Sequence, residues 1–142
     1  RWRNGGKFDG KMLTEDQKHI YSIYQRILTL CNKEKAITEG EFFDLMYANA
    51  NGWRFNEHKQ YTFLRKAGKE LLFIIVNFDH ISVDVAINVP SHAFDFLQIP
   101  QMDIYPAVDL LTGKTESISL LPYKATEISV EGYSGKILKI KL

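Results

Sequence analysis

Apolar and polar positions repeat with two different periods along this chain. Between Leu13 and Lys33 the apolar residues recur every three or four positions, as on one face of an amphipathic helix. Thr14 and Gln17 have the spacing of a capping box, and no glycine or proline interrupts the segment. The pattern predicts one long amphipathic helix. Its apolar stripe consists of Ile20, Ile23, Tyr24, Ile27, Leu28 and Cys31.

From Glu41 onward the period changes to two, which is typical of strands with one buried face. The strands are expected at 41–47, 60–66, 70–78, 82–89, 103–111, 115–121, 125–130 and 135–142. Short turns join them, such as Ala67-Gly68-Lys69. Short antiparallel strands at intervals of about ten residues favour a sandwich. The expected fold class is therefore mainly β, an antiparallel Greek-key β-sandwich of about eight strands preceded by the helix.

Composition narrows the classes of function. The chain has 142 residues, of which 45% are hydrophobic, so it can build a real core. Eighteen basic and 17 acidic residues give a net charge of +1, which argues against a nucleic-acid-binding face. No apolar run reaches the roughly 18 residues that a membrane span needs. The one cysteine, Cys31, cannot form an intramolecular disulfide, and it is expected to be a small buried residue.

The sequence offers little catalytic chemistry. The four histidines, at positions 19, 58, 80 and 92, lack the spacing of metal ligands, so no metal site and no cofactor are expected. There is no glycine-rich phosphate loop and no nucleophile elbow. The carboxylates lie at solvent-facing strand positions or beside turns, and they are interpreted as solvated surface. They include Asp44, Asp79, Asp84, Asp95, Asp103, Asp109, Glu116 and Glu127. No catalytic residue is therefore expected in this chain.

The loop at 48–59 holds one candidate contact with sugar. Trp53 could stack on a sugar ring while Asn51 and Arg54 bond to its hydroxyl groups. The alternative is that Trp53 folds back and pins its own loop. Of the two interpretations, the sequence favours a Trp53 that pins its own loop.

The order of the segments resembles one known family. "NGGKFDG" followed by "DQKHIYSIYQRILTL" resembles the stretch that leads into the last barrel helix of family 13 glycoside hydrolases, the α-amylase superfamily. The later segments are similar to successive pieces of the C-terminal β-sandwich of that family, called domain C. They are "GEFFDLMYAN", "YTFLRK", "LLFIIVNFD", "VAINVPSHAF", "DLLTGK" and "KILKIKL". The family often has an arginine where this chain has Cys31 or Asn32.

The resemblance implies a division of the chain. Residues 1–39 would be the end of a (β/α)8 barrel including its last helix, and residues 40–142 the C-terminal β-sandwich. The catalytic aspartates and glutamate of the family lie on barrel strands that would precede Arg1, so none is carried over to a position here. The apolar stripe would face the barrel, or would favour self-association of an isolated fragment.

The expected function is therefore a non-catalytic domain that packs on and stabilises the catalytic barrel of an α-amylase-like enzyme. The partner is that barrel, and the parent's substrates are α-glucans such as starch and maltooligosaccharides. The resemblance implies a secreted or periplasmic parent, while the chain itself leaves the compartment open. Two alternatives remain: a carbohydrate-binding module that uses the Trp53 loop, and an unrelated β-sandwich interaction domain.

Overall fold

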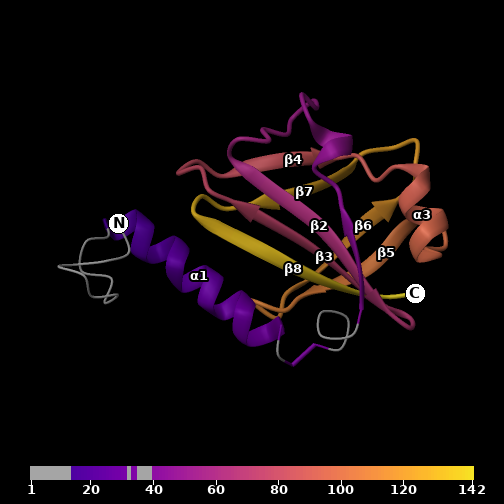
Figure 1. The fold of residues 1–142 in the computed structure, drawn as a ribbon, viewed down its shortest axis with the longest axis horizontal. Coiled ribbons are helices and arrows are strands. Elements are labelled where there is room, and N and C mark those ends of the chain that lie inside the picture. Colours follow the sequence, from indigo (N-terminus) through magenta and orange to yellow (C-terminus); the bar gives the residue numbers. More distant parts are fainter. Residues whose placement is uncertain (1–13, 32, 35–39) are drawn as a thin grey trace.

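A computed structural model describes residues 14–31, 33–34 and 40–142 of the chain (Figure 1). Within the first helix, the side chains of residues 16, 20, 24, 28 and 31 lie outside this description. The helices are α1 (Glu15–Cys31), the 3-10 helix η1 (Tyr47–Asn49) and α3 (Ser91–Leu97). The strands are β1 (Glu41–Asp44), β2 (Gln60–Ala67), β3 (Glu70–Asn77), β4 (Val83–Ile87), β5 (Met102–Asp109), β6 (Thr115–Leu120), β7 (Thr126–Val130) and β8 (Ser134–Lys141).

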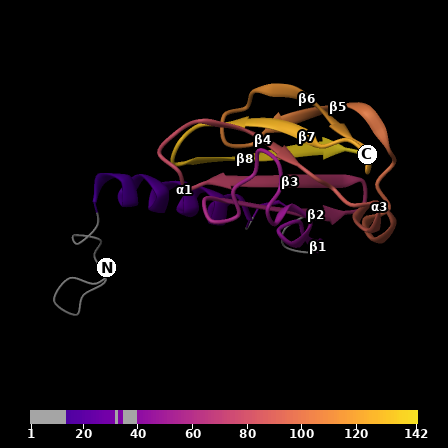
Figure 2. The same ribbon diagram turned by 90° about the horizontal axis from the view of Figure 1, so that it is seen from above.

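The strands form two antiparallel sheets. Six of them lie in the order β1-β2-β3-β8-β5-β6, which Figure 2 shows from above, and β4 pairs with β7 in a second sheet. The prediction of a mainly β, antiparallel fold is confirmed. The turn expected at Gly68 is present as well, and this glycine has a φ of 60°, a value that favours glycine.

The molecule has three layers. The β4-β7 sheet lies on one side of the six-stranded sheet, and α1 lies on the other side (Figure 1). The face of the six-stranded sheet toward β4-β7 is called inner here, and the opposite face outer. The main core fills the space between the sheets, with Phe73 and Leu138 from one sheet and Ile87 and Ile128 from the other. Helix α3 closes one end of this core with Phe94 and other apolar residues.

Helix α1 begins as its sequence predicts. The Thr14 backbone N–H donates to Gln17 Oε1 (2.9 Å), and the Gln17 N–H donates to Thr14 Oγ1 (3.2 Å). These two bonds are the capping box, which satisfies N–H groups that the first turn would otherwise leave unpaired. Among the described residues, no helix has the length and apolar character to cross a membrane.

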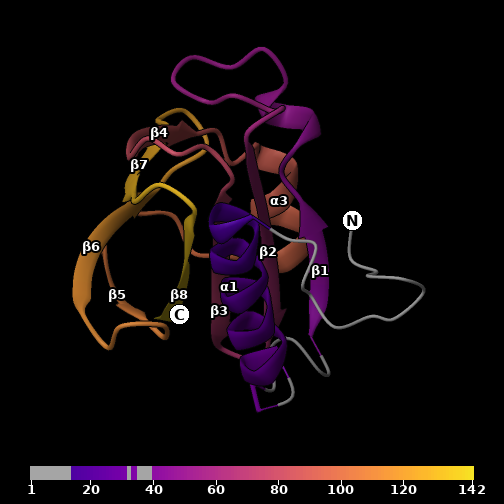
Figure 3. The same ribbon diagram turned by 90° about the vertical axis from the view of Figure 1, so that its left-hand side faces the viewer.

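A second apolar cluster joins α1 to the outer face. Ile23 and Ile27 are buried against Leu72, Ile74 and Ile137 of β3 and β8. Figure 3 shows α1 lying along this part of the sheet. Burial of one such side chain stabilises by about 1.5–3 kcal/mol, so these contacts can hold the helix on the sheet.

One carboxylate is not where the alternation placed it. Asp109 was expected on the solvated surface, but it is only 3% exposed. Its Oδ1 accepts bonds from the N–H groups of Leu111 (3.1 Å) and Ile137 (3.3 Å), and its Oδ2 accepts from Thr112 Oγ1 (3.1 Å). Asp109 therefore holds the turn after β5 against β8, because a buried carboxylate is tolerated where backbone N–H groups bond to it.

Candidate functional site

The loop between η1 and β2 carries the predicted sugar contacts, and Asn49 anchors its start. The Asn49 side chain is 1% exposed. Its Nδ2 donates to the carbonyl groups of Leu45 (2.8 Å) and Asn88 (2.9 Å), and its Oδ1 accepts from the Asn88 N–H (2.7 Å). One buried amide thus ties this loop to the residue that follows β4. The sequence pattern does not distinguish Asn49, because asparagine is common in turns and loops of every kind.

Arg54 fixes the tip of the loop to the two-stranded sheet. Its Nε donates to the Asp84 carbonyl (3.0 Å), and Nη1 lies 2.6 Å from Glu127 Oε1. Its own carbonyl accepts from the Ala86 N–H (3.1 Å). The backbone of Arg54 has a φ of 56°, which few non-glycine residues adopt. Two N–H donors of this guanidinium are therefore used in contacts that hold the loop on the two-stranded sheet.

Trp53 stands on the surface of the loop with 71% of its area exposed. The Arg54 guanidinium carbon lies 4.9 Å from the centroid of its ring, in a cation–π contact. The indole therefore rests on Arg54 and is not inserted into the core. The structure brings these two predicted residues together. Asn51, the third, is exposed in the same loop with a φ of 56°.

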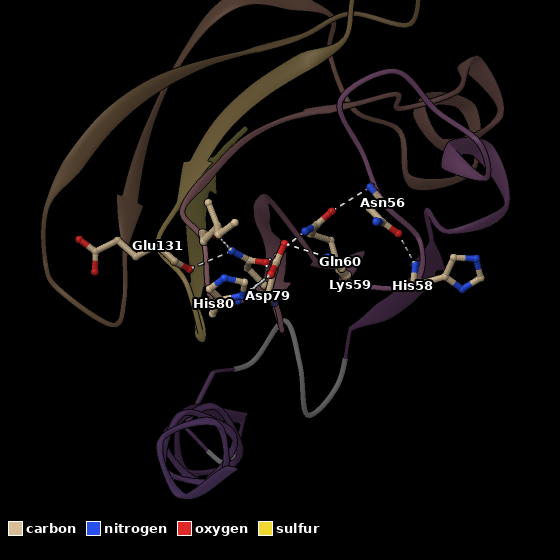
Figure 4. Close-up of polar contacts among 9 residues, drawn as sticks. Asn56, His58, Lys59, Gln60, Asp79, His80 and Glu131 are labelled. Atoms are coloured by element: carbon tan, nitrogen blue, oxygen red, sulfur yellow. Dashed lines mark hydrogen bonds and ion pairs between the residues drawn. The ribbon is translucent and has the colours of Figure 1, made fainter. Parts of the chain in front are cut away.

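A depression of about 410 Å³ lies beside this loop, lined by Gly52, Arg54, Phe55, Asn56 and other residues. Figure 4 shows the polar contacts of Asn56, Gln60 and Asp79, which line it. Gln60 Oε1 accepts from the Asn56 N–H (2.8 Å), and Gln60 Nε2 donates to Asn77 Oδ1 (3.1 Å). Gln60 is 4% exposed, and these bonds satisfy its buried amide.

Asn77 continues this chain of amides. It is fully buried, and its Nδ2 donates to the carbonyl groups of Ile81 (2.9 Å) and Glu131 (3.2 Å). The turn after β3 and the turn after β7 are thereby joined. Every polar atom of Gln60 and Asn77 named above has a partner inside the protein. Gln60, which lines the depression, and Asn77 beside it therefore form a structural network.

Asp79 carries the charge at the edge of the depression. Its Oδ2 lies 3.4 Å from Lys59 Nζ, and its Oδ1 lies 3.0 Å from His80 Nδ1 (Figure 4). Partial desolvation acts to raise the pKa of this carboxyl. The hydrogen bonds and charges of Lys59 and His80 act in the opposite sense and hold the pKa of Asp79 below its usual value. Asp79 is therefore a stable anion at neutral pH, which suits an ion-pair partner.

The remaining site predictions concern metal binding and the apolar stripe. Within residues 14–31, 33–34 and 40–142, no three His, Cys, Asp or Glu side chains are grouped so as to hold a metal ion. Ile23 and Ile27 of the predicted interface lie against the chain's own sheet. The other members of the stripe lie outside the described side chains; they are Ile20, Tyr24, Leu28 and Cys31.

Comparison with known proteins shows which fold this is. No family model matches the sequence, and no curated protein matches it. Among solved structures, a maltogenic α-amylase from Thermotoga neapolitana matches 98% of this chain with a TM-score of 0.61 and 16% identity. An α-amylase from Geobacillus thermoleovorans, solved with acarbose, matches 99% with a TM-score of 0.58 and 13% identity. The chain therefore has an amylase-related fold.

This chain is much shorter than the proteins that it matches. The chain spans 32% of the Thermotoga protein and 27% of the Geobacillus protein. A Bacillus halodurans protein that carries the name of another glycosidase, an α-N-acetylgalactosaminidase, also matches 99% of this chain (TM-score 0.51, 12% identity) and is spanned to 36%. The fold is thus shared by a part of several larger glycoside hydrolases, and it does not by itself separate their substrates.

Proposed function

We propose that this chain is the non-catalytic C-terminal domain of an α-amylase-like glycoside hydrolase and that it stabilises the catalytic barrel. The observation that carries the proposal is the match of nearly the whole chain, helix and sheets together, to about a third or less of longer α-amylases. The docking of α1 on the outer face supports it, because this helix would couple the sandwich to a barrel. Family 13 resemblance in the sequence points to the same assignment.

Under this proposal the two parts of the chain belong to different domains of the parent enzyme. Residues 1–39 would end a (β/α)8 barrel, and residues 40–142 would be domain C, with Greek-key connections between its strands. Catalytic carboxylates would lie on barrel strands, and the parent would act on α-glucans. The apolar stripe would meet the barrel through residues that the chain's own sheet does not cover.

Hydrolysis assays test this assignment. The 142-residue chain should release no reducing sugar from starch or maltoheptaose above background. The polypeptide encoded by the complete reading frame that contains this chain should contain a (β/α)8 barrel and should hydrolyse an α-glucan. Turnover by the 142-residue chain that is lost on changing one of its own carboxylates would contradict the proposal, as would a reading frame without a barrel.

A second candidate function rests on Trp53. An indole that is 71% exposed and lies beside a depression is suited to stack on a sugar ring. The Arg54 guanidinium covers part of the ring, so a sugar would use the remaining surface. Titration of the chain with maltoheptaose, followed by tryptophan fluorescence, tests this candidate. Saturable quenching would support it, and an unchanged spectrum at millimolar sugar would exclude it.

A further inference from the structure

Asn51 lies in a tight turn of the loop between η1 and β2. The Gly52 N–H donates to the Asn49 carbonyl oxygen (3.0 Å). Ala50 has a φ of −60° and a ψ of 127°, and Asn51 has a φ of 56°. These values describe a type II β-turn over residues 49–52, with Asn51 at its third position. Glycine is favoured at that position and asparagine is the usual alternative, because both tolerate a positive φ.

This turn is held firmly on both sides and closed by a single bond between them. The buried Asn49 side chain makes three hydrogen bonds before it, and the Arg54 side chain bonds to Asp84 and Glu127 after it. The bond from Gly52 to the Asn49 carbonyl closes the turn itself. A turn with one closing bond in a surface loop opens at a much smaller free energy than the whole fold.

The side-chain amide of Asn51 is available for reaction. The residue is exposed, and within the described part of the chain no group bonds to its amide. Gly52 follows it and has no Cβ that could shield its backbone nitrogen. An unbonded amide next to an unshielded backbone nitrogen is the arrangement that cyclisation between the two needs.

The other described asparagines lack one of these features. Asn49 and Asn77 are buried, and their amides are hydrogen-bonded. The Asn56 amide oxygen accepts from the His58 N–H (2.9 Å). Asn88 is exposed, but Val89 follows it, and a β-branched side chain crowds the backbone beside it.

We propose that Asn51 is a site of spontaneous deamidation. The backbone nitrogen of Gly52 loses its proton and forms a bond to the Asn51 side-chain carbonyl carbon, and the amide nitrogen leaves as ammonia. Water then opens the resulting succinimide ring at either of its carbonyl carbons, which leaves aspartate or isoaspartate. Water is the one co-reactant, and no atom is oxidised or reduced. This site depends on the loop alone and is independent of the proposed function.

The turn sets the pace of the reaction in the folded chain. The Gly52 nitrogen can attack only after its N–H leaves the Asn49 carbonyl, so the reacting molecules are those in which the turn has opened. The folded chain should therefore react more slowly than the unfolded chain, and still faster at Asn51 than at the other described asparagines.

Deamidation changes the charge and the geometry of the loop. A carboxylate replaces a neutral amide, so the net charge falls from +1 to zero at pH 7. The new anion belongs to the loop that the Arg54–Glu127 ion pair holds on the two-stranded sheet. Isoaspartate also adds one carbon atom to the backbone, which a type II turn closed at Asn49 does not accommodate. Both products therefore alter the surface that carries Trp53.

Mass spectrometry of the incubated protein tests this site. The 142-residue chain is kept at mildly alkaline pH, folded and in urea, and fragment spectra follow each asparagine with time. In the folded chain Asn51 should convert to aspartate and isoaspartate several-fold faster than Asn88. In urea Asn51 should react faster still, at the rate of Asn4, which is also followed by glycine.

Two results would overturn the proposal. If Asn51 stays intact in the folded chain over the time in which it converts completely in urea, the bond from Gly52 to Asn49 protects it. If Asn51 and Asn88 convert equally in the folded chain, the following glycine and the turn confer no special reactivity.

Substitutions at the two residues give an independent readout. Asn51→Gly removes the reacting amide and suits the third position of a type II turn, so conversion here should disappear while the urea midpoint stays equal or rises. Gly52→Ala keeps the amide but adds a Cβ, which would lie 3.0 Å from the Asn49 carbonyl oxygen in the folded chain. In urea, where the turn is absent, Gly52→Ala should slow conversion of Asn51 several-fold. An unchanged rate there, or a lower urea midpoint for Asn51→Gly, would contradict the proposal.

Discussion

Lys139 Nζ on β8 lies 3.1 Å from Glu34 Oε2 and 3.7 Å from Glu70 Oε1. One ammonium group thus joins the segment that leaves α1 to the beginning of β3. The hydrogen bond to Glu34 raises the pKa of Lys139, and the charges of Glu34 and Glu70 add to this, while burial acts to lower it. The ion pair therefore fixes the helix exit on the outer face next to the apolar contacts of Ile23 and Ile27.

Replacing this lysine should loosen the helix exit. Lys139→Met keeps the length of the side chain but removes the charge, and we expect the free energy of unfolding to fall by roughly 1–3 kcal/mol at pH 7. Because the pKa is raised on folding, the stabilisation is complete below about pH 10.4 and is lost as the pH rises through the raised pKa. Urea titrations across this range measure it. Lys141→Met, at an exposed position on the same strand, should change little.

The stability that Asp79 contributes should depend on pH in the opposite sense to that of Lys139. Its pKa is lowered on folding, so its contribution to stability is present above about pH 4 and is lost as the pH falls through the lowered pKa. Asp79→Asn should therefore destabilise the chain at pH 7, and the difference from wild type should shrink in acid. Asp103→Asn, which removes an exposed pair with Lys124, is the control and should have a smaller effect. A pH-independent effect of Asp79→Asn would refute this account.

The docking of α1 can be tested at one buried residue. Ile27 is 7% exposed and packs against β3 and β8. Ile27→Ala should lower the free energy of unfolding by about 2–4 kcal/mol in urea titrations, because it leaves a cavity in the outer cluster. Ile81→Ala, at a residue that is 56% exposed, should cost much less. Equal costs would mean that the helix does not rest on the sheet.

Trp53 separates the two candidate functions. Trp53→Ala should leave the free energy of unfolding within about 0.5 kcal/mol of wild type, because most of the indole is exposed. If the loop is a carbohydrate site, the same substitution should weaken maltoheptaose binding by about 1–3 kcal/mol. Tyr47→Ala, at another exposed aromatic residue, is the control for calorimetric titration. A large loss of stability in Trp53→Ala would mean that the indole pins its loop after all.

The sequence predicted the start of the helix and the positions of the strands because these features depend on residues that are close together in the chain. The capping box of Thr14 and Gln17 spans three residues, and the strand alternation reports burial on one face directly. The pairing of strands that are distant in sequence, such as β3 with β8, does not follow from a periodic pattern. The cluster beneath α1 depends on that pairing, because it combines residues of both strands, so alternation alone did not reveal it.

The candidate site was harder to predict for the same reason. Trp53 and Arg54 are neighbours in sequence, and their contact could be anticipated, but Glu127 and Asp84 reach Arg54 from other strands. Gly132 is a further example, since a Cβ there would lie 2.2 Å from the His80 carbonyl oxygen. Such a close approach between two turns leaves no signal in one sequence. Asp109 was misjudged because its burial depends on the β8 strand that covers it.

The central claim is that this chain stabilises a catalytic barrel without taking part in the chemistry. The most direct measurement compares wild type with Ile74→Ala in the polypeptide of the complete reading frame, because Ile74 is fully buried beneath α1. The account predicts a lower temperature of half-inactivation, since the cavity weakens the sandwich, and an unchanged kcat for maltoheptaose at low temperature. A kcat that collapses while the inactivation temperature stays at the wild-type value would contradict it.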